Sequence, residues 1–221
     1  MLVVDGGSIT YGDELANCQD AWPYLIDNNT INLALKGKSP EHIELDVMSY
    51  YYTHNKFDEC IIAWPSTVRN CVYKADIRTY IDFNSKALFS DTYQDSSYVK
   101  KFYKQYFCQA ESLRKHWLRC LRLISWFNQQ NIKWMMLNQD TIEQQIYTQD
   151  RQLFPWFHNT NDDQIEEIFA NLRTLEKEII SLKNYIRFTD YCVFAGKLGH
   201  PNKQEHYDIA CTVKGFWNGI G

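Results

Sequence analysis

Residues 2–15 have the sequence LVVDGGSITYGDEL, which joins a short apolar run to a glycine-rich turn and a serine. The apolar part, Leu2–Asp5, is typical of a buried strand. Gly6 and Gly7 allow the backbone to turn sharply where that strand ends and a helix is about to begin. We therefore expect Ser8 to be exposed at the carboxyl edge of the strand, close to backbone N–H groups. This position suits a nucleophile, although Gly-Gly-Ser turns are common and the G-x-S-x-G sequence of α/β-hydrolase nucleophiles is absent.

Short apolar runs alternate with amphipathic stretches along much of the chain. This alternation is the pattern of βαβ units and predicts an α/β fold with a parallel sheet. After the first strand the expected elements are a helix over 13–27, a strand over 30–35, a helix over 40–54, a strand over 57–64, a helix over 97–124, a strand over 132–137 and a last helix over 203–217. The helix over 97–124 has many Lys and Arg residues on its polar face, which predicts either an anion-binding stripe or an ordinary solvated face.

Two stretches interrupt the alternation, so we expect one domain with two insertions. Residues 65–96 lack periodicity and are rich in Tyr, Asp and Ser, which predicts an irregular segment at a strand end where α/β proteins often build ligand sites. Residues 150–190 contain apolar side chains at alternating three- and four-residue steps over 165–186, which is a heptad seam. The seam either joins two copies of the chain in a homo-oligomer or packs on its own domain. Flanking aromatic residues widen the stripe and favour self-packing.

The composition excludes several classes of protein. The net charge of −4, from 23 basic and 27 acidic residues, favours neither nucleic acid nor an anionic membrane as a partner. There is no apolar run of about 18 residues and no leader-like segment before the first strand, so we expect a cytoplasmic protein. The seven cysteines form no C-x-x-C pair and indicate reduced thiols. The six histidines lack metal-binding spacing, and no nucleotide-binding motif is present, so no metal or cofactor is expected.

A candidate base for Ser8 lies near the other end of the sequence. His200 stands in the string Gly-His-Pro-Asn over 199–202, just before the last expected helix. A histidine in a loop is often only solvated, but from this position an imidazole could reach the hydroxyl of Ser8. The pair suggests acyl transfer by a serine nucleophile.

Four segments together resemble the SGNH (GDSL) hydrolases. Residues 2–15, 32–39 (NLALKGKS), 61–64 (IIAW) and 199–202 (GHPN) are similar to the first, second, third and fifth sequence blocks of that family, in the same order. The likeness is greatest to members often encoded by bacteriophages. The resemblance implies a flavodoxin-like three-layer α/β/α sandwich that needs no cofactor.

The resemblance also implies roles for particular residues. Ser8 corresponds to the nucleophile and His200 to the general base, while the backbone N–H groups of Ser8 and Gly37 correspond to donors to the oxyanion. The implied activity is hydrolysis of small acyl esters, for example O-acetyl groups on carbohydrates.

The sequence departs from the family at three positions. Gly7 replaces the family's Asp before the nucleophile. No Asn occurs at 64–66, where the family has an oxyanion donor whose loss costs about 10²–10³ in turnover, and Ser66 is the candidate substitute. The Asp expected two or three residues before the base falls at 197–198, where the residues are Lys and Leu; Asp190 or a backbone carbonyl is the candidate substitute. Loss of that carboxylate costs about 10⁴ in a well-studied serine protease.

Two functions are therefore left open. Retention of Ser8 and His200 favours a weak or specialised serine esterase. The missing Asn and Asp favour a catalytically impaired relative, a pseudoenzyme that acts as a binding or structural component, for instance in a phage particle.

Overall fold

The central sheet has five parallel strands in the order β2-β1-β3-β6-β7. The computed structural model describes residues 1–65, 67, 69–74, 79–83, 101, 109–138, 162–187 and 200–220. The sheet strands are β1 (Leu2–Gly6), β2 (Ile31–Asn32), β3 (Glu59–Trp64), β6 (Lys133–Asn138) and β7 (Tyr185–Arg187). Counted along the chain within this sheet, the order is 2-1-3-4-5, which is the flavodoxin-like arrangement. The predicted α/β fold with a parallel sheet is confirmed.

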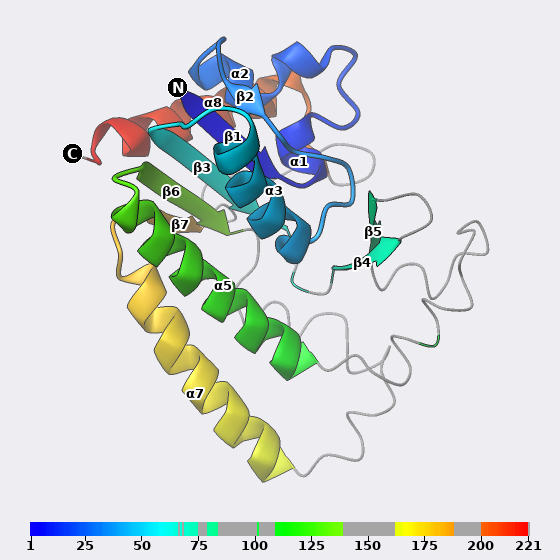
Figure 1. The fold of residues 1–221 in the computed structure, drawn as a ribbon, viewed down its shortest axis with the longest axis vertical. Helices are drawn as coiled ribbons and strands as arrows, with labels where there is room; N and C mark the ends of the chain where they lie inside the picture. The colour runs from blue at the N-terminus through cyan, green and yellow to red at the C-terminus, as the bar shows by residue number, and fades with distance from the viewer. Residues whose placement is uncertain are drawn as a thin grey trace.

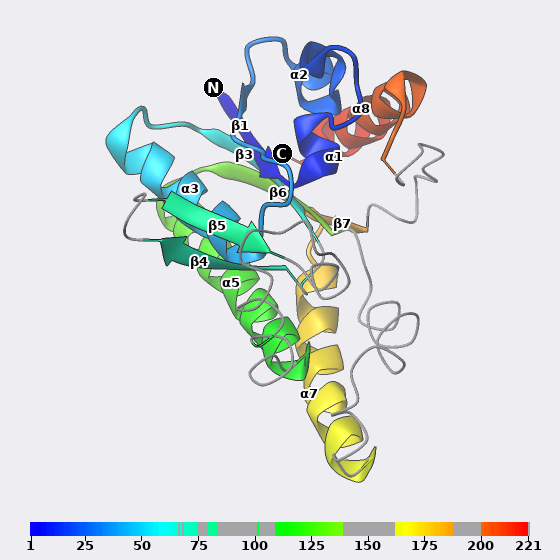
Figure 2. The ribbon, with the colours of Figure 1, turned by 90° about the vertical axis from the view of Figure 1, so that its right-hand side faces the viewer.

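Helices cover both faces of the sheet and complete three layers (Figures 1 and 2). One face carries α3 (Pro40–Thr53), α5 (Gln109–Gln129) and α7 (Asp162–Ile180); the other carries α1 (Ser8–Tyr11), the 3-10 helix η1 (Cys18–Asp20), α2 (Trp22–Ile26) and α8 (Lys203–Asn218). In the parts of the chain that the structure describes, no helix is long and apolar enough to span a bilayer.

Alternate strand residues enter two separate cores, one on each face of the sheet. The core under α3, α5 and α7 includes Val3, Cys60, Ile62 and Met136 from the strands and Val47, Leu113, Trp117, Phe127 and Ile179 from the helices. The core under α2 and α8 includes Leu2, Val4, Ile61, Met135 and Leu137 from the strands and Trp22, Ile209, Val213 and Trp217 from the helices. Because both faces are buried, the strands are continuous apolar runs, which is the signal that the sequence displays.

The segment after β1 differs from the single helix expected over 13–27. Instead, α1 begins at Ser8 and ends before Gly12, and only the short η1 and α2 follow. Gly12 (φ 85°) and Glu14 (φ 70°) adopt left-handed backbone conformations, which no helix can propagate through. The apolar periodicity of this segment arises from the packing of a compact turn and not from one helix.

The described part of the first insertion is a β-hairpin and not an irregular segment. Strands β4 (Asn70–Lys74) and β5 (Thr79–Phe83) pair in an antiparallel manner. The hairpin is fastened to α3 because the Asp82 carboxylate lies 2.7 Å from His42 Nδ1 and accepts a hydrogen bond from Ser39 N. The remainder of the expected insertion, 84–96, lies outside the described residues.

The second insertion supplies α7 and β7, an integral layer and an edge strand of the fold. Leu172 and Ile179 of the heptad seam are buried in the chain's own core, where α7 lies beside α5 (Figure 1). The seam does not continue as helix to its end, because a turn follows Ile180 and Ile186 lies in β7. This part of the seam therefore packs on the chain's own domain. A homo-oligomer through 165–186 stays a prediction.

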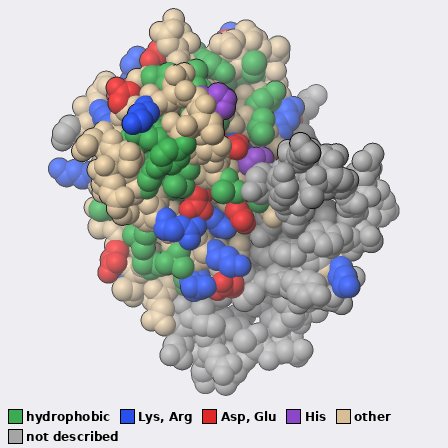
Figure 3. Space-filling view, viewed as in Figure 1, with side chains coloured by type: hydrophobic (Ala, Val, Ile, Leu, Met, Phe, Trp, Pro, Cys, Tyr) green, Lys and Arg blue, Asp and Glu red, His purple; other side chains and the backbone are tan. Residues whose placement is uncertain are grey.

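The basic face of α5 is neutralised by acidic partners. Arg119 contacts Glu41, and Arg122 forms two hydrogen bonds with Glu44, both acidic residues of α3. Figure 3 shows basic and acidic side chains intermixed on this face of the molecule. The described part of the helix therefore has the character of an ordinary helix face and not of an anion-binding stripe.

A buried ion pair connects the end of β1 to the loop that follows β2. Lys38 and Asp5 are both fully buried, and Lys38 Nζ donates hydrogen bonds of 2.8 Å to both carboxylate oxygens of Asp5 and one of 2.9 Å to Leu33 O. Asp46 of α3 lies 2.6 Å from the same ammonium group. Burial raises the pKa of Asp5 to about 7, although the charge of Lys38 opposes that rise.

Replacing Lys38 by Met should lower the free energy of unfolding by about 3–5 kcal/mol, because the Asp5 carboxylate would lose its buried partner. Urea unfolding measures the change. The control is Lys36→Met, since Lys36 is a largely exposed lysine of the same loop and solvent screens its ion pair with Asp13. Equal losses in the two variants would contradict a special role for the buried pair.

Candidate active site

Ser8 and His200 meet at the carboxyl edge of the sheet. His200 Nε2 lies 2.9 Å from Ser8 Oγ, a hydrogen bond between residues 192 positions apart in the sequence. Ser8 is the first residue of α1, directly after β1, and His200 stands three residues before α8. The structure thus brings together the two residues that the sequence singled out.

The approach of His200 depends on how α8 begins. Asn202 caps the helix by accepting a hydrogen bond from Glu205 N, and Asn202 N in turn donates one to the Glu205 carboxylate. His206 on the next turn is fully buried and accepts a hydrogen bond from Trp22 N, which ties α8 to α2. Burial lowers the pKa of His206 to about 4, so it is a neutral packing residue.

Ser8 is more enclosed than the sequence predicts. The expectation of an exposed corner serine is wrong, because only 7% of Ser8 is accessible to solvent. The register of the sheet explains this, since Gly6, Ala63 and Leu137 stand in one row at the ends of β1, β3 and β6. Ser8 therefore starts its helix beside the neighbouring strand ends and beneath His200.

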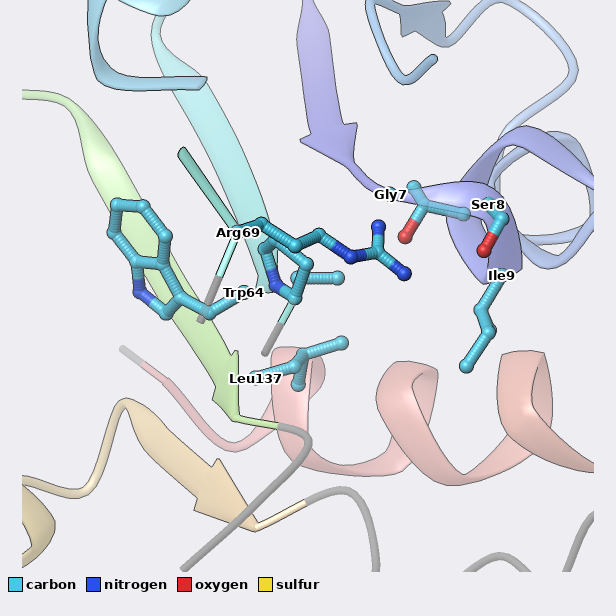
Figure 4. A pocket seen from close by; sticks show the side chains of 9 residues that line it. Gly7, Ser8, Ile9, Trp64, Arg69 and Leu137 are labelled. Carbon is cyan, nitrogen blue, oxygen red and sulfur yellow. The ribbon is translucent and has the colours of Figure 1, made fainter. Parts of the chain in front are cut away.

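A small pocket opens beside Ser8. It contains about 330 Å³ of empty space, part of which is open solvent. Its lining consists of Gly7, Ser8, Ile9, Thr10, Ala63, Trp64, Pro65, Arg69 and Leu137. The indole of Trp64 points away from Ser8 (Figure 4) and is buried edge-on against His116. The walls are mainly apolar, but the pocket also contains a guanidinium group.

That guanidinium belongs to Arg69, which points toward Gly7 and Ser8 (Figure 4). A Cβ atom at position 7 would lie 2.9 Å from Arg69 Nη1, so the arginine occupies the space beside the glycine that replaces the family's Asp. Arg69 Nη1 also lies 3.5 Å from Lys38 O, as a weak donor to that carbonyl. Sequence reasoning missed Arg69, because it lies in a stretch that carries no periodic signal.

Glu14 is the second residue that sequence reasoning missed. Its Oε2 lies 3.7 Å from His200 Nδ1, on the opposite side of the imidazole ring from Ser8. Its only sequence signal is a carboxylate six residues after the nucleophile, whereas the family comparison directs attention to the residues before the base.

Of the remaining predicted site residues, Gly37 is the one that the structure describes. Gly37 has a left-handed conformation (φ 77°) that suits a glycine, but it is not among the residues that line the pocket. Its role as an oxyanion donor stays a prediction. Ser66 and Asp190 lie outside the described residues. Within the described ranges, no group of three or more His, Cys, Asp or Glu residues could hold a metal ion.

Similar folds occur among solved structures at very low sequence identity. A G-D-S-L family protein from Desulfitobacterium hafniense DCB-2 matches with a TM-score of 0.54 and 11% identity, over 97% of this chain and 98% of that one. TesA matches with a TM-score of 0.54 and 10% identity, over 100% and 99%. The esterase EstA from Pseudoalteromonas sp. matches with a TM-score of 0.51 and 9% identity, over 99% and 97%. The fold is that of the GDSL hydrolases. No protein-family model and no curated protein matches the sequence of this GDSL-like chain.

Replacing Gly6 by Ala should destabilise the protein by about 1–3 kcal/mol, because a Cβ there would lie 2.8 Å from Ala63 O and closer still to Thr10 Oγ1. Thermal or urea unfolding measures the effect. The matched control is Gly215→Ala in α8, where a Cβ would meet nothing within 4 Å and should stabilise the helix by about 1 kcal/mol. A neutral Gly6→Ala variant would show that the start of α1 can move away from β3.

Proposed function

We propose that this protein is a serine ester hydrolase in which Ser8 is the nucleophile and His200 the general base. The observation that carries the proposal is the 2.9 Å hydrogen bond between His200 Nε2 and Ser8 Oγ, at the edge of a parallel sheet where α/β proteins place their ligands. The resemblance of the sequence segments around both residues to GDSL hydrolases is a separate line of support.

The reaction would proceed in two halves. His200 Nε2 takes the proton of Ser8 Oγ as that oxygen attacks the ester carbonyl carbon, and the imidazolium then gives the proton to the departing alcohol oxygen. A water molecule next attacks the acyl–Ser8 ester, again with His200 as the base. The acid is released, and Ser8 recovers its proton.

The negative charge on the carbonyl oxygen needs donors. We assign the backbone N–H groups of Ser8 and Gly37 to this role by resemblance. Arg69 supplies positive charge to the pocket beside Ser8, where the sequence has no Asn to match that of the GDSL hydrolases. A preorganised charge of this kind stabilises the oxyanion more than the ground-state carbonyl.

The size of the pocket limits the substrate. The enclosed part of the mainly apolar pocket is small, because its 330 Å³ of empty space includes open solvent, and a space of this kind suits a short acyl group. We therefore propose small acyl esters, for example O-acetyl groups on carbohydrates, as the substrate class. A phage origin, and a place in the host cytoplasm or in the virion, complete the proposal and rest on the sequence alone.

Ser8→Ala should abolish labelling by a fluorophosphonate, a reagent that reports an activated serine without requiring the natural substrate. Intact-mass spectrometry should find one adduct on the unmodified protein and none on the variant. Ser125→Ala is the control, because Ser125 is an exposed serine of α5 and its removal should leave labelling unchanged. Ser8→Ala should change the free energy of unfolding by only about 1 kcal/mol, the value of one hydrogen bond.

The absence of an adduct on the folded, unmodified protein would refute the hydrolase proposal. It would favour the other function, that of a catalytically impaired GDSL-like protein with a binding or structural role.

Arg69→Met should lower kcat for a small acyl ester by up to about 10²–10³ and leave KM nearly unchanged, as loss of an oxyanion donor does elsewhere. Steady-state kinetics over a range of p-nitrophenyl acetate concentrations measures both constants. Arg69→Lys should recover part of the loss, because it restores the charge without the guanidinium geometry. A raised KM at constant kcat would instead assign Arg69 to substrate binding.

A further inference from the structure

Among the residues that the structure describes, none forms a hydrogen bond with His200 Nδ1, the ring nitrogen that faces away from Ser8. For Nε2 to accept the proton of Ser8, the neutral imidazole must carry its own proton on Nδ1. In this structure Nδ1 is shielded from solvent and forms no hydrogen bond with any described residue. A buried N–H group without an acceptor raises the free energy of the folded protein, and this cost falls when an acceptor approaches.

The carboxylate of Glu14 is placed to be that acceptor. The 3.7 Å between its Oε2 and His200 Nδ1 is within the range of an ion pair but longer than a hydrogen bond. Both side chains are mostly enclosed, with exposed fractions of 28% for Glu14 and 18% for His200. Hydrogen bonds of catalytic groups are often long in unliganded enzymes and tighten when substrate binds.

The backbone holds Glu14 in this place at some cost. Its φ of 70° is in the left-handed region, which a glutamate seldom adopts. The turn that contains it is tied to the nucleophile, because Asp13 N donates to Ser8 O at 3.0 Å and Glu14 N donates to Asp13 Oδ1 at 3.1 Å. The backbone conformation thus fixes where the Glu14 side chain leaves the backbone relative to Ser8.

We propose that Glu14 is the positioning carboxylate of His200, supplied by the segment after the nucleophile and not by the segment before the base. It accepts a hydrogen bond from Nδ1–H, holds the tautomer in which Nε2 is free to accept, and stabilises the imidazolium that forms when Ser8 attacks. Glu14 stays ionised throughout, and the proton from Ser8 resides on Nε2 until the alcohol leaves. This inference rests on the proposed function of Ser8 and His200.

Glu14→Gln keeps the shape of the side chain and removes its charge. It should lower kcat for a small ester, and the rate of fluorophosphonate labelling, by tenfold or more, up to the limit of about 10⁴ seen where a triad carboxylate is directly hydrogen-bonded. KM should not change. Glu14→Asp should recover part of the rate, because it restores the charge at a greater distance.

The matched control is Asp20→Asn. Asp20 is a carboxylate with a similar exposed fraction of 29%, and it pairs with Lys203 at the start of α8, so its removal makes the same change in charge near His200. Labelling and kcat should be unchanged in this variant. An equal loss in Asp20→Asn and Glu14→Gln would overturn the proposal, because the effect would then be one of general charge.

A second measurement tests Glu14 independently of catalysis. Nitrogen-15 NMR of the unmodified protein should show neutral His200 mainly as the Nδ1–H tautomer, and Glu14→Ala should shift the population toward Nε2–H while the other histidine signals stay in place. If the unmodified protein is not labelled by the fluorophosphonate, the proposed function fails, yet the tautomer shift still supports the contact with Glu14. If labelling occurs and both the labelling rate and the His200 signals are unaltered in Glu14→Gln and Glu14→Ala, the Glu14 inference is overturned and another acceptor orients the ring.

Discussion

The buried ammonium group of Lys38 joins the segments on which the candidate site is built. It binds the carboxylate of Asp5, whose Oδ1 also accepts a hydrogen bond from Gly6 N at the end of β1. The ammonium group also binds Leu33 O after β2 and Asp46 of α3. The backbone oxygen of Lys38 accepts a hydrogen bond from Arg69. A charged group that is buried away from water is stable only when opposite charges and hydrogen-bond partners surround it. The position of the Ser8 turn relative to the neighbouring loops therefore depends on one internal cation.

The parallel sheet then decides which parts of the chain can contribute to the site. All five strands end at the same edge, so the turn after β1, the loop after β3 and the end of β6 surround a single pocket. His200 arrives from a different direction. The apolar face of α8 packs under the sheet with α2, and this packing brings the residues just before α8 to Ser8. The contact between Ser8 and His200 thus depends on a core to which neither residue belongs.

The departures from the GDSL sequence pattern have a consistent physical interpretation. Gly7, in place of an Asp, leaves space that Arg69 occupies, and Arg69 brings positive charge to a pocket without the usual Asn. Glu14 brings negative charge to the outer side of the imidazole, where the usual Asp is missing. An imidazole that acts as a base needs a hydrogen-bond acceptor near Nδ1, which a carboxylate supplies best, and an oxyanion needs donors near the carbonyl oxygen. Neither requirement specifies a position in the sequence.

The sequence by itself determined the elements whose signals are local. The apolar runs predicted β1, β3 and β6, and the amphipathic stretches between and after them predicted α3 and α8. The motifs around Ser8 and His200 predicted that these two residues would meet. Only the tertiary structure decided the rest. The turn over 13–27 depends on left-handed residues, and the hairpin of β4 and β5 depends on contacts with α3. Strand β7 depends on pairing with a strand 49 residues earlier. Glu14 lies near His200, and Arg69 lies near Ser8, because separate segments of the chain pack together. No pattern within a single segment of the sequence indicates either contact.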